Sequence, residues 1–257
     1  MSHWSAILMK YFILTLALVF TACNPKESGK IDARPKIGVD PTWSPLNFGA
    51  QTPYVNGFVD ELLRDIADEL DIEFNKIRVN PGDLLSGLDE GVYDAVLTSL
   101  PPYTFNVAKY DFSKNFLATG PVFIVPKEAG YKKLSELHHQ AVGIIEHSPA
   151  IEILRKYSNL FVRSYVSTPD LLNAIVEGEI AGALLARVPA AAYVPDLYQE
   201  KLKIVSMPLT DQGLQLITLK KSQEEFLESF DGVLRYLKRK KKIDDLLKKW
   251  SLSLTEG

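Results

Sequence analysis

The chain has 257 residues, of which 29 are Lys or Arg and 32 are Asp or Glu, so its formal net charge is −3 at pH 7. This mildly acidic balance gives no electrostatic case for nucleic acid as a partner. A single cysteine excludes a disulfide within the chain and the cysteine clusters that hold zinc or iron–sulfur centres, so an exported domain must rely on its apolar core. The length is enough for one large or two small domains. We expect no metal and no cofactor.

The N-terminus is typical of a secretory signal peptide. Lys10 precedes a ten-residue apolar run at 11–20, and small residues then lead to Cys23. The run is too short to span a membrane comfortably. We therefore expect residues 1–22 to be a signal peptide, with an uncleaved signal anchor or a free buried thiol as the alternatives. Residues 23–34 are polar, contain Pro and Gly, and are expected to form a flexible tether.

Strand and helix patterns alternate from residue 34 onward. The helix prediction is clearest at 57–70, where apolar residues recur every three or four positions. Such alternation is expected of an α/β sheet. In chain order the sequence predicts a strand at 34–40, a helix at 57–70, a strand at 77–79, a helix at 83–90 capped by Gly91, and a strand at 94–97.

The second half repeats this alternation. Proline just inside a helix start and glycine just after its end are the strongest boundary signals here. The predicted elements are a strand at 141–145, a helix begun by Ser148-Pro149, a helix begun by Thr168-Pro169-Asp170 and closed by Gly178, a strand at 181–185, a helix at 226–237 behind a capping box at 222–225, and a final helix at 243–250.

Two further strand-like stretches, at 120–125 and 215–219, lie at the expected boundaries between lobes. If the chain crosses from one lobe to the other at both, the first lobe consists of residues 35–121 plus 220–251. The second lobe is then residues 122–219, with a hinge strand at each end. Ligands of such folds bind in a cleft between the lobes, beside strand ends and helix N-termini.

Several short motifs occur in an order that matches a known family. They are Ile37-Gly-Val-Asp40, Trp43-Ser-Pro-Leu-Asn-Phe48, Gly57-Phe-Val-Asp-Glu-Leu62, Leu84-Leu-Ser-Gly-Leu-Asp-Glu-Gly-Val-Tyr-Asp94-Ala-Val96, Tyr110-Asp-Phe-Ser113 and Leu246-Leu-Lys-Lys-Trp250. Each is weak alone, but as an ordered set they make the chain resemble the bacterial extracellular solute-binding proteins of family 3, which serve polar amino acid ABC transporters.

The resemblance implies a two-lobed Venus-flytrap fold, the periplasmic binding protein type II fold, with a mixed sheet flanked by helices in each α/β lobe and a two-strand hinge. It implies a small polar ligand, an ABC transporter permease in the membrane as partner, and no enzymatic activity. We expect a monomer. In addition, Phe20-Thr-Ala-Cys23 resembles a bacterial lipobox, which implies lipidation of Cys23 and an exported, membrane-anchored protein.

The resemblance also indicates the ligand site. Aromatic groups after the first strand usually cover the ligand, with Phe48 and Tyr54 as possible helpers or core residues, and the loop after the strand at 94–97 supplies polar contacts. A helix start near residue 148 favours an anion through its free N–H groups. The expected ligand-binding residues are Asp40, Trp43, Thr98, Ser99, Pro101, Tyr103, Asn106, Ser148 and Arg187.

Two charged positions of the family pattern are changed. The arginine that grips an amino acid's carboxylate falls at Asn106, and the aspartate that binds its ammonium falls at Ala186, directly before Arg187. A buried ligand charge without a partner would cost several kcal/mol. Three explanations stay open: a differently charged ligand, new positions such as Arg187 for the binding groups, or a register displaced by a few residues.

Two other functions remain as alternatives to transport. A dehydratase of similar fold could use Glu146 as a cleft carboxylate for acid–base chemistry. The same two-lobed fold could also serve a ligand-sensing or surface receptor, and the sequence does not separate this function from transport.

Overall fold

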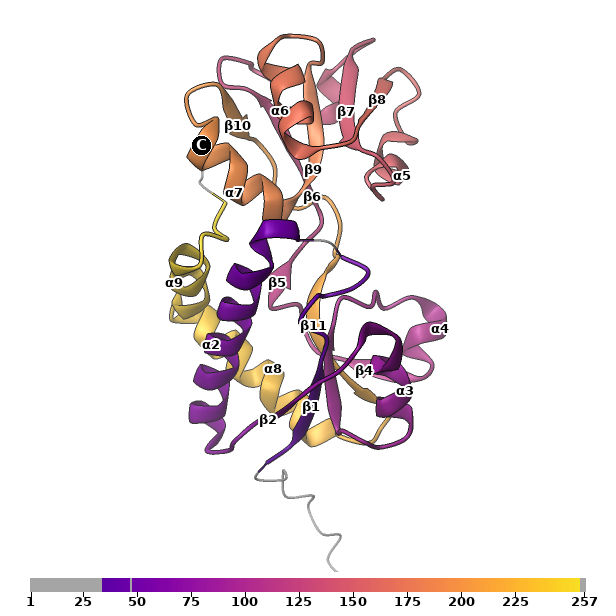
Figure 1. Cartoon of the computed structure of the whole chain (residues 1–257), viewed down its shortest axis with the longest axis vertical. Helices are drawn as coiled ribbons and strands as arrows, with labels where there is room; N and C mark the ends of the chain where they lie inside the picture. Colours follow the sequence, from indigo (N-terminus) through magenta and orange to yellow (C-terminus); the bar gives the residue numbers. More distant parts are fainter. Residues whose placement is uncertain (1–33, 47, 255–257) are drawn as a thin grey trace, which may run out of the picture. The chain divides into compact units, whose positions relative to one another are not determined.

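The computed structural model describes residues 34–46 and 48–254 (Figure 1). The predicted signal peptide and the predicted lipidation of Cys23 lie outside the described residues. The described chain forms two mixed β-sheets, one with six strands and one with five.

The first sheet is built from both ends of the described chain. Its order is β2-β1-β3-β11-β4, and β5 also pairs with β11. β1 is parallel to β2 and β3, whereas β11 is antiparallel to β3, β4 and β5. The strands are β1 (Lys36–Val39), β2 (Asn75–Arg78), β3 (Ala95–Thr98), β4 (Tyr110–Phe112), β5 (Leu117–Ala118) and β11 (Gly213–Leu219).

Helices cover this sheet with apolar side chains. α2, α8 and α9 pack on one another, and α3 packs against β1, β3 and β11 (Figure 1). The core under α3 includes Leu88, Tyr93 and Ile217. The helical elements are η1 (Gly49–Gln51), α2 (Thr52–Leu70), η2 (Pro81–Asp83), α3 (Leu84–Asp89), α4 (Thr104–Val107), α8 (Glu224–Arg239) and α9 (Lys242–Lys249).

The second sheet comes from one continuous segment, in the order β10-β6-β9-β7-β8. β7 is parallel to β8 and β9, and β6 is antiparallel to β9 and β10. The elements are β6 (Pro121–Pro126), η3 (Leu134–Glu136), β7 (Ala141–Ile145), α5 (Ile151–Leu154), β8 (Phe161–Tyr165), α6 (Thr168–Val176), β9 (Gly182–Ala186), α7 (Arg187–Leu197) and β10 (Leu202–Ile204).

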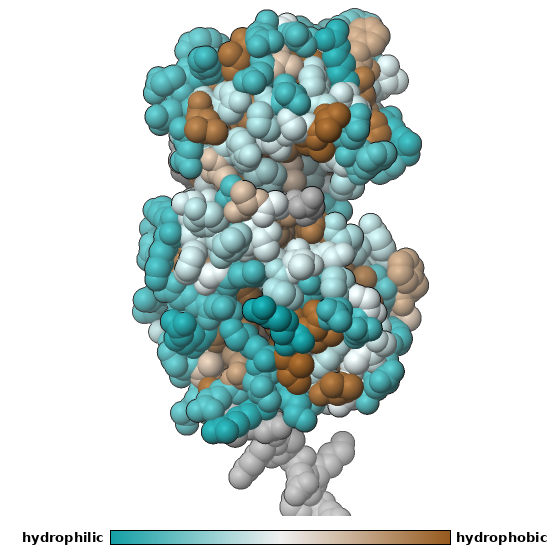
Figure 2. All heavy atoms as spheres, in the orientation of Figure 1, coloured by the Kyte–Doolittle hydropathy of each residue, from teal (hydrophilic) through white to brown (hydrophobic). Residues whose placement is uncertain are grey.

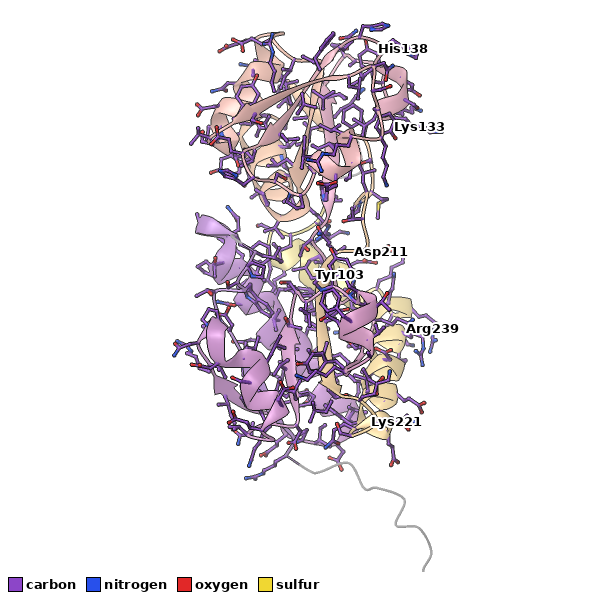
Figure 3. All side chains as sticks on the ribbon, turned by 90° about the vertical axis from the view of Figure 1, so that its right-hand side faces the viewer. Tyr103, Lys133, His138, Asp211, Lys221 and Arg239 are labelled. Carbon is purple, nitrogen blue, oxygen red and sulfur yellow. The ribbon has the colours of Figure 1, made fainter. Side chains whose placement is uncertain are left out.

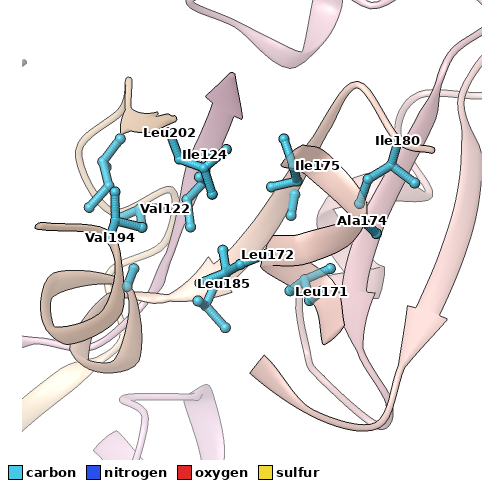
Figure 4. Close-up of a cluster of buried hydrophobic side chains, with 13 residues drawn as sticks. Val122, Ile124, Leu171, Leu172, Ala174, Ile175, Ile180, Leu185, Val194 and Leu202 are labelled. Carbon is cyan, nitrogen blue, oxygen red and sulfur yellow. The ribbon is translucent and has the colours of Figure 1, made fainter. Parts of the chain in front are cut away.

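Both faces of the central strands of the second sheet, β6, β7 and β9, are buried. Because side chains alternate along a strand, β6 sends Val122 and Ile124 to one face and Phe123 and Val125 to the other. Figure 4 shows the first of these two cores, in which side chains from α6 and α7 meet those of β6, β9 and β10. The surface seen in Figure 2 is mainly hydrophilic, with hydrophobic side chains in small separate groups.

Several predicted boundaries are confirmed. β7 covers 141–145 as predicted, and α6 begins at Thr168. The glycines predicted to end helices, Gly91 and Gly178, have φ values of +72° and +75°. These values are in the left-handed region, where glycine is favoured because it has no Cβ.

Other boundaries differ from the prediction. α2 begins at Thr52, five residues ahead of the predicted start at 57, with Pro53 in its first turn. The sequence prediction starts later because this first turn has little apolar periodicity. The predicted capping box is wrong: the N-cap is Gln223, it makes no side-chain cap bond, and the Ser222 hydroxyl donates to the Leu219 carbonyl instead. The elements β4, β5, β8, β10, α4 and α7 were absent from the sequence prediction.

The return from the second sheet to the first lies earlier than the sequence suggested. Residues 215–219 are predicted to close the second lobe as a hinge strand, but their strand β11 is hydrogen-bonded to β3 and β4 of the first sheet. The chain therefore leaves the second sheet after β10 at Ile204 and re-enters the first at Gly213. Across residues 34–46 and 48–254, no helix has the length and apolar character needed to cross a membrane.

Candidate functional site

Most of the predicted ligand-binding residues share one topological position. Asp40 follows β1, Ser99 follows β3 and Arg187 follows β9, while Ser148 lies shortly after β7. β1 and β3 are parallel neighbours in the first sheet, and β7 and β9 are parallel neighbours in the second. Loops beyond the carboxyl ends of parallel strands are where open α/β sheets bind ligands. The topology thus places the candidates at the two sheet edges expected to carry a ligand.

Asp40 organises the loop after β1. It is 2% exposed, and its Oδ1 accepts hydrogen bonds from the backbone N–H and hydroxyl of Thr42 at 2.8 and 2.7 Å. Its Oδ2 accepts from the Ser44 N–H at 2.8 Å. Three donors therefore occupy the carboxylate, so Asp40 shapes the loop. Its predicted contact with a ligand stays a prediction.

Trp43 is buried in the same loop. It is 2% exposed, and its indole Nε1 donates to Oδ1 of Asn56 on α2 at 2.7 Å. Asn56 donates in turn to the Pro41 carbonyl at 3.1 Å. The alternative for Phe48, a core residue, is confirmed by its 6% exposure, whereas Tyr54 is exposed. A hollow of about 240 Å³ beside this loop is lined by Val39, Pro41, Trp43, Asn56, Val59, Asp60, Lys76 and Arg78.

Polar side chains stabilise the loop between β3 and α4 from within. The Thr98 hydroxyl accepts from the Leu100 N–H at 3.1 Å. Asn106, the position at which the resemblance predicts the family's carboxylate-binding arginine, is 7% exposed and donates from Nδ2 to the Pro101 carbonyl at 2.7 Å. Its amide therefore closes the loop on itself. The side chains of Thr98 and Asn106 serve the loop, and their predicted ligand contacts remain untested.

Two aromatic rings at the start of α4, where this loop ends, remain open to solvent. Tyr103 is 56% exposed and Phe105 is 71% exposed, and their ring centroids lie 5.8 Å apart at an interplanar angle of 45°. Figure 3 shows Tyr103 beside the short helix α4, whose N-cap it forms. Of the first-sheet candidates, Tyr103 is therefore the side chain most available to an incoming molecule. Tyr103 was among the predicted binding residues, whereas Phe105 was not.

The predicted helix start at Ser148 is wrong. α5 begins at Ile151, its N-cap is Ala150, and it has four residues. The Ser148 hydroxyl instead accepts from the Ala150 N–H at 3.2 Å, in a turn that starts after His147 at φ +59°. So short a helix has little dipole to favour an anion. The predicted ligand contact of Ser148 stays a prediction.

Arg187 is a buried cation at the crossover between the sheets. It is 7% exposed and is the first residue of α7. Its backbone N–H donates to the Gly120 carbonyl at 3.1 Å, and Nη1 lies 3.5 Å from the Ala118 carbonyl. Burial lowers the pKa of Arg187 to about 10, so the guanidinium is still charged at neutral pH. Among the described residues it forms no ion pair.

A second polar group at the crossover was not predicted from the sequence. Thr119, between Ala118 and Gly120, is 5% exposed, and its buried hydroxyl has no hydrogen-bond partner in the described part of the chain. No spacing or composition signal marks this threonine. Its neighbours Ala118 and Gly120 contact Arg187 only in the folded chain, where two segments that are distant in sequence meet.

Comparison with known proteins identifies relatives along almost the whole folded chain. A model of the bacterial extracellular solute-binding proteins, family 3, matches residues 36–253. The amino-acid-binding protein AabA of Dichelobacter nodosus is 24% identical over 246 residues, which cover 93% of this chain and 97% of that protein. The L-cystine-binding protein TcyJ of Escherichia coli K12 is 23% identical over 217 residues, which cover 83% of this chain and 81% of that protein.

Solved structures agree in fold. The L-cystine solute receptor of Neisseria gonorrhoeae, in its unliganded open conformation, has a TM-score of 0.70 at 17% identity, covering 86% of this chain and 93% of that one. A likeness at this identity concerns the fold alone. It confirms the predicted type II architecture, with two mixed sheets flanked by helices.

Proposed function

The chain belongs to the bacterial extracellular solute-binding proteins of family 3, and from this membership we propose that it captures a small polar solute and delivers it to an ABC importer. The observation that carries the proposal is the continuous family match over 36–253, which includes the strand-end loops of both sheets. A dehydratase acting through Glu146 is not favoured, since the family and the relatives are binding proteins.

The solute is proposed to be an amino acid, an amino acid derivative or a small peptide-like molecule. The names of two relatives support this class, because one binds amino acids and the other binds L-cystine. The exposed rings of Tyr103 and Phe105 supply flat apolar surface, and Arg187 supplies a positive charge. We propose that the ligand binds a closed arrangement of the two lobes better than an open one and so shifts the population towards it.

We further propose that the protein is an exported lipoprotein that acts as a monomer at a membrane surface. The apolar run at 11–20 and the Phe20-Thr-Ala-Cys23 motif support the signal and the anchor. Replacing Cys23 by serine is expected to move the protein from the membrane fraction to the soluble exported fraction. The chain has no second cysteine to modify, so unchanged membrane association of the Cys23→Ser variant would contradict a cysteine-linked anchor.

Ligand screening tests the binding function directly. The purified protein is titrated with free amino acids, dipeptides and organic acids, and binding is followed by thermal shift and then by calorimetry. A cognate solute at about a hundred times its Kd should stabilise the protein by about 2.7 kcal/mol. Stabilisation by none of these classes would argue against the proposed function, as would conversion of prephenate or arogenate into product.

A further inference from the structure

Arg187 is a buried positive charge for which the described chain supplies no counter-charge. The residue is 7% exposed, and the ion pairs formed by the described residues all involve other cations. The one side-chain hydrogen bond that Arg187 makes to the described residues, from Nη1 to the Ala118 carbonyl, has a donor–acceptor distance of 3.5 Å and is longer than a good hydrogen bond. A buried charge is normally paired, because desolvation is costly without a partner.

A buried hydroxyl without a hydrogen-bond partner among the described residues lies in the same crossover. The Thr119 hydroxyl is buried and, within the described chain, unpartnered, and Thr119 stands between the two residues whose carbonyls contact Arg187. Most buried side-chain polar atoms have at least one good hydrogen-bond partner, so a buried guanidinium with one long hydrogen bond and a buried hydroxyl with none, in adjoining segments of the described chain, are unusual. The Arg187 guanidinium is a charged donor, and the Thr119 hydroxyl can donate or accept. A negatively charged acceptor would satisfy both groups.

The backbone at the start of α7 also favours a negatively charged group. Arg187 is the first residue of α7, which has eleven residues and no acidic side chain in its first turn. The positive end of a helix dipole favours an anion. The residue before the helix is Ala186, whose methyl group offers no acceptor to a cation. The charge of the side chain and the helix dipole therefore select for the same kind of ligand group.

We propose that Arg187 and Thr119 form an anion subsite that takes the carboxylate of the transported solute, and that this carboxylate is not flanked by an ammonium group. Arg187 grips the carboxylate through its guanidinium fork, and the Thr119 hydroxyl donates a further hydrogen bond. The solute class is thus a small organic acid or an N-acylated amino acid rather than a free zwitterion. This inference rests on the proposed binding function and narrows its ligand.

The first test uses the protein without ligand. Arg187→Met removes the charge at similar length, and we expect its melting temperature to rise by about 2–5 °C because an uncompensated buried cation is lost. Thr119→Val, which replaces an unpartnered hydroxyl by a methyl group, should also raise it. Arg163→Met, at an exposed arginine of β8, is the matched control and should leave it unchanged. If the melting temperature falls in both Arg187→Met and Thr119→Val, the two side chains stabilise the fold, and the proposed anion subsite is overturned.

The second test separates the ligand's charges. Four compound sets share the same amino acid side chains: the free amino acids, their N-acetyl derivatives, their amides and their N-acetyl amides. We expect binding by N-acetyl amino acids and none by either amide set. Arg187→Met should weaken that binding about a hundredfold or more, Thr119→Val about tenfold, and Arg163→Met not at all.

The outcomes of the second test distinguish a failure of the anion subsite from a failure of the proposed solute-binding function. Equal binding of acids and their amides would overturn the anion subsite but leave solute binding intact. Tighter binding of free amino acids than of their N-acetyl derivatives would overturn the assigned charge pattern alone. If no compound of the four sets and no simple carboxylic acid binds, both the subsite and the proposed function fail.

Discussion

The indole Nε1 of Trp43 and the amide Oδ1 of Asn56 lie 2.7 Å apart, which bonds the loop after β1 to the first turns of α2. The Asn56 amide also donates to the Pro41 carbonyl. The Asn56 side chain therefore bonds two polar groups of this loop, and the carboxylate of Asp40 accepts hydrogen bonds from others. The loop is thereby held in place before any ligand arrives.

Replacing Asn56 by alanine should destabilise the protein. The variant leaves the buried indole N–H without its acceptor, and we expect a loss of about 1–3 kcal/mol in the free energy of unfolding, measured in urea. Asn75→Ala, at an exposed residue at the start of β2, is the control and should change stability by less than about 0.5 kcal/mol. Equal effects of the two variants would contradict the bracing role of Asn56.

Two helical glycines should respond in opposite directions to alanine. A Cβ on Gly57 of α2 would overlap ring atoms of Trp250, so Gly57→Ala must displace the indole and should cost about 1–3 kcal/mol. A Cβ on Gly232 of α8 would meet nothing closer than 3.9 Å, so Gly232→Ala should stabilise by about 0.5–1 kcal/mol. Thermal unfolding of both variants checks the signs. Stabilisation by Gly57→Ala would mean that Trp250 does not pack on α2.

Glu61 should make stability depend on pH in the acidic range. Its carboxylate accepts from Lys249 Nζ at 2.7 Å and from Trp250 Nε1 at 3.0 Å, and these hydrogen bonds, led by that of Lys249, hold the pKa of Glu61 below its usual value. A depressed pKa stabilises the fold above the unfolded-state value, and the stabilisation is lost as pH falls through the folded-state pKa.

Comparison of wild type with Glu61→Gln by urea unfolding tests this dependence. At pH 7 the wild type should be more stable by about 0.5–1 kcal/mol, a modest figure because solvent screens the half-exposed Lys249. The difference should shrink below about pH 4.5, the ordinary pKa of a glutamate, as the carboxyl group becomes protonated. A difference that is the same at neutral pH and at about pH 3 would contradict the assigned role of the carboxylate.

Substitutions at two nearby residues, Asn106 of α4 and its N-cap Tyr103, should affect different properties: the first the stability of the fold, the second the affinity for the solute. Asn106→Ala removes the buried donor to the Pro101 carbonyl and should cost about 1–2 kcal/mol of stability. Tyr103 is 56% exposed, so Tyr103→Ala should change stability by less than about 0.5 kcal/mol while weakening solute binding. Calorimetric titration beside urea unfolding measures both effects. Unchanged affinity in Tyr103→Ala would remove that ring from the binding site.

The regular elements were predictable where local signals agreed. The strand at 141–145 is a short apolar run, and α6 has a proline in its first turn and a left-handed glycine after its end. α7 was missed because its eleven residues contain Pro189 and Pro195 and have no one-sided apolar pattern. It is a helix because its small residues let it pack closely on β9 and β10, which local propensity does not reveal.

The sequence predicted which strand ends carry the candidate residues, but not the hydrogen bonds that each candidate makes. Asp40, Trp43 and Asn106 turn their polar groups inward to hold their own loops. Which acceptor a side chain finds depends on the path of the backbone, and that path is not encoded in spacing. The burial of Arg187 depends likewise on segments nearly seventy residues apart in the chain.

The position of β11 has a consequence for the order in which the protein is made. A ribosome that has completed residue 204 has delivered every strand of the second sheet, since β6 to β10 form one uninterrupted segment. The first sheet at that moment lacks the strand that joins β3 to β4, and α8 and α9 do not yet exist. The inserted half can therefore fold first during synthesis, while the half that begins the folded chain waits for the segment that is made last.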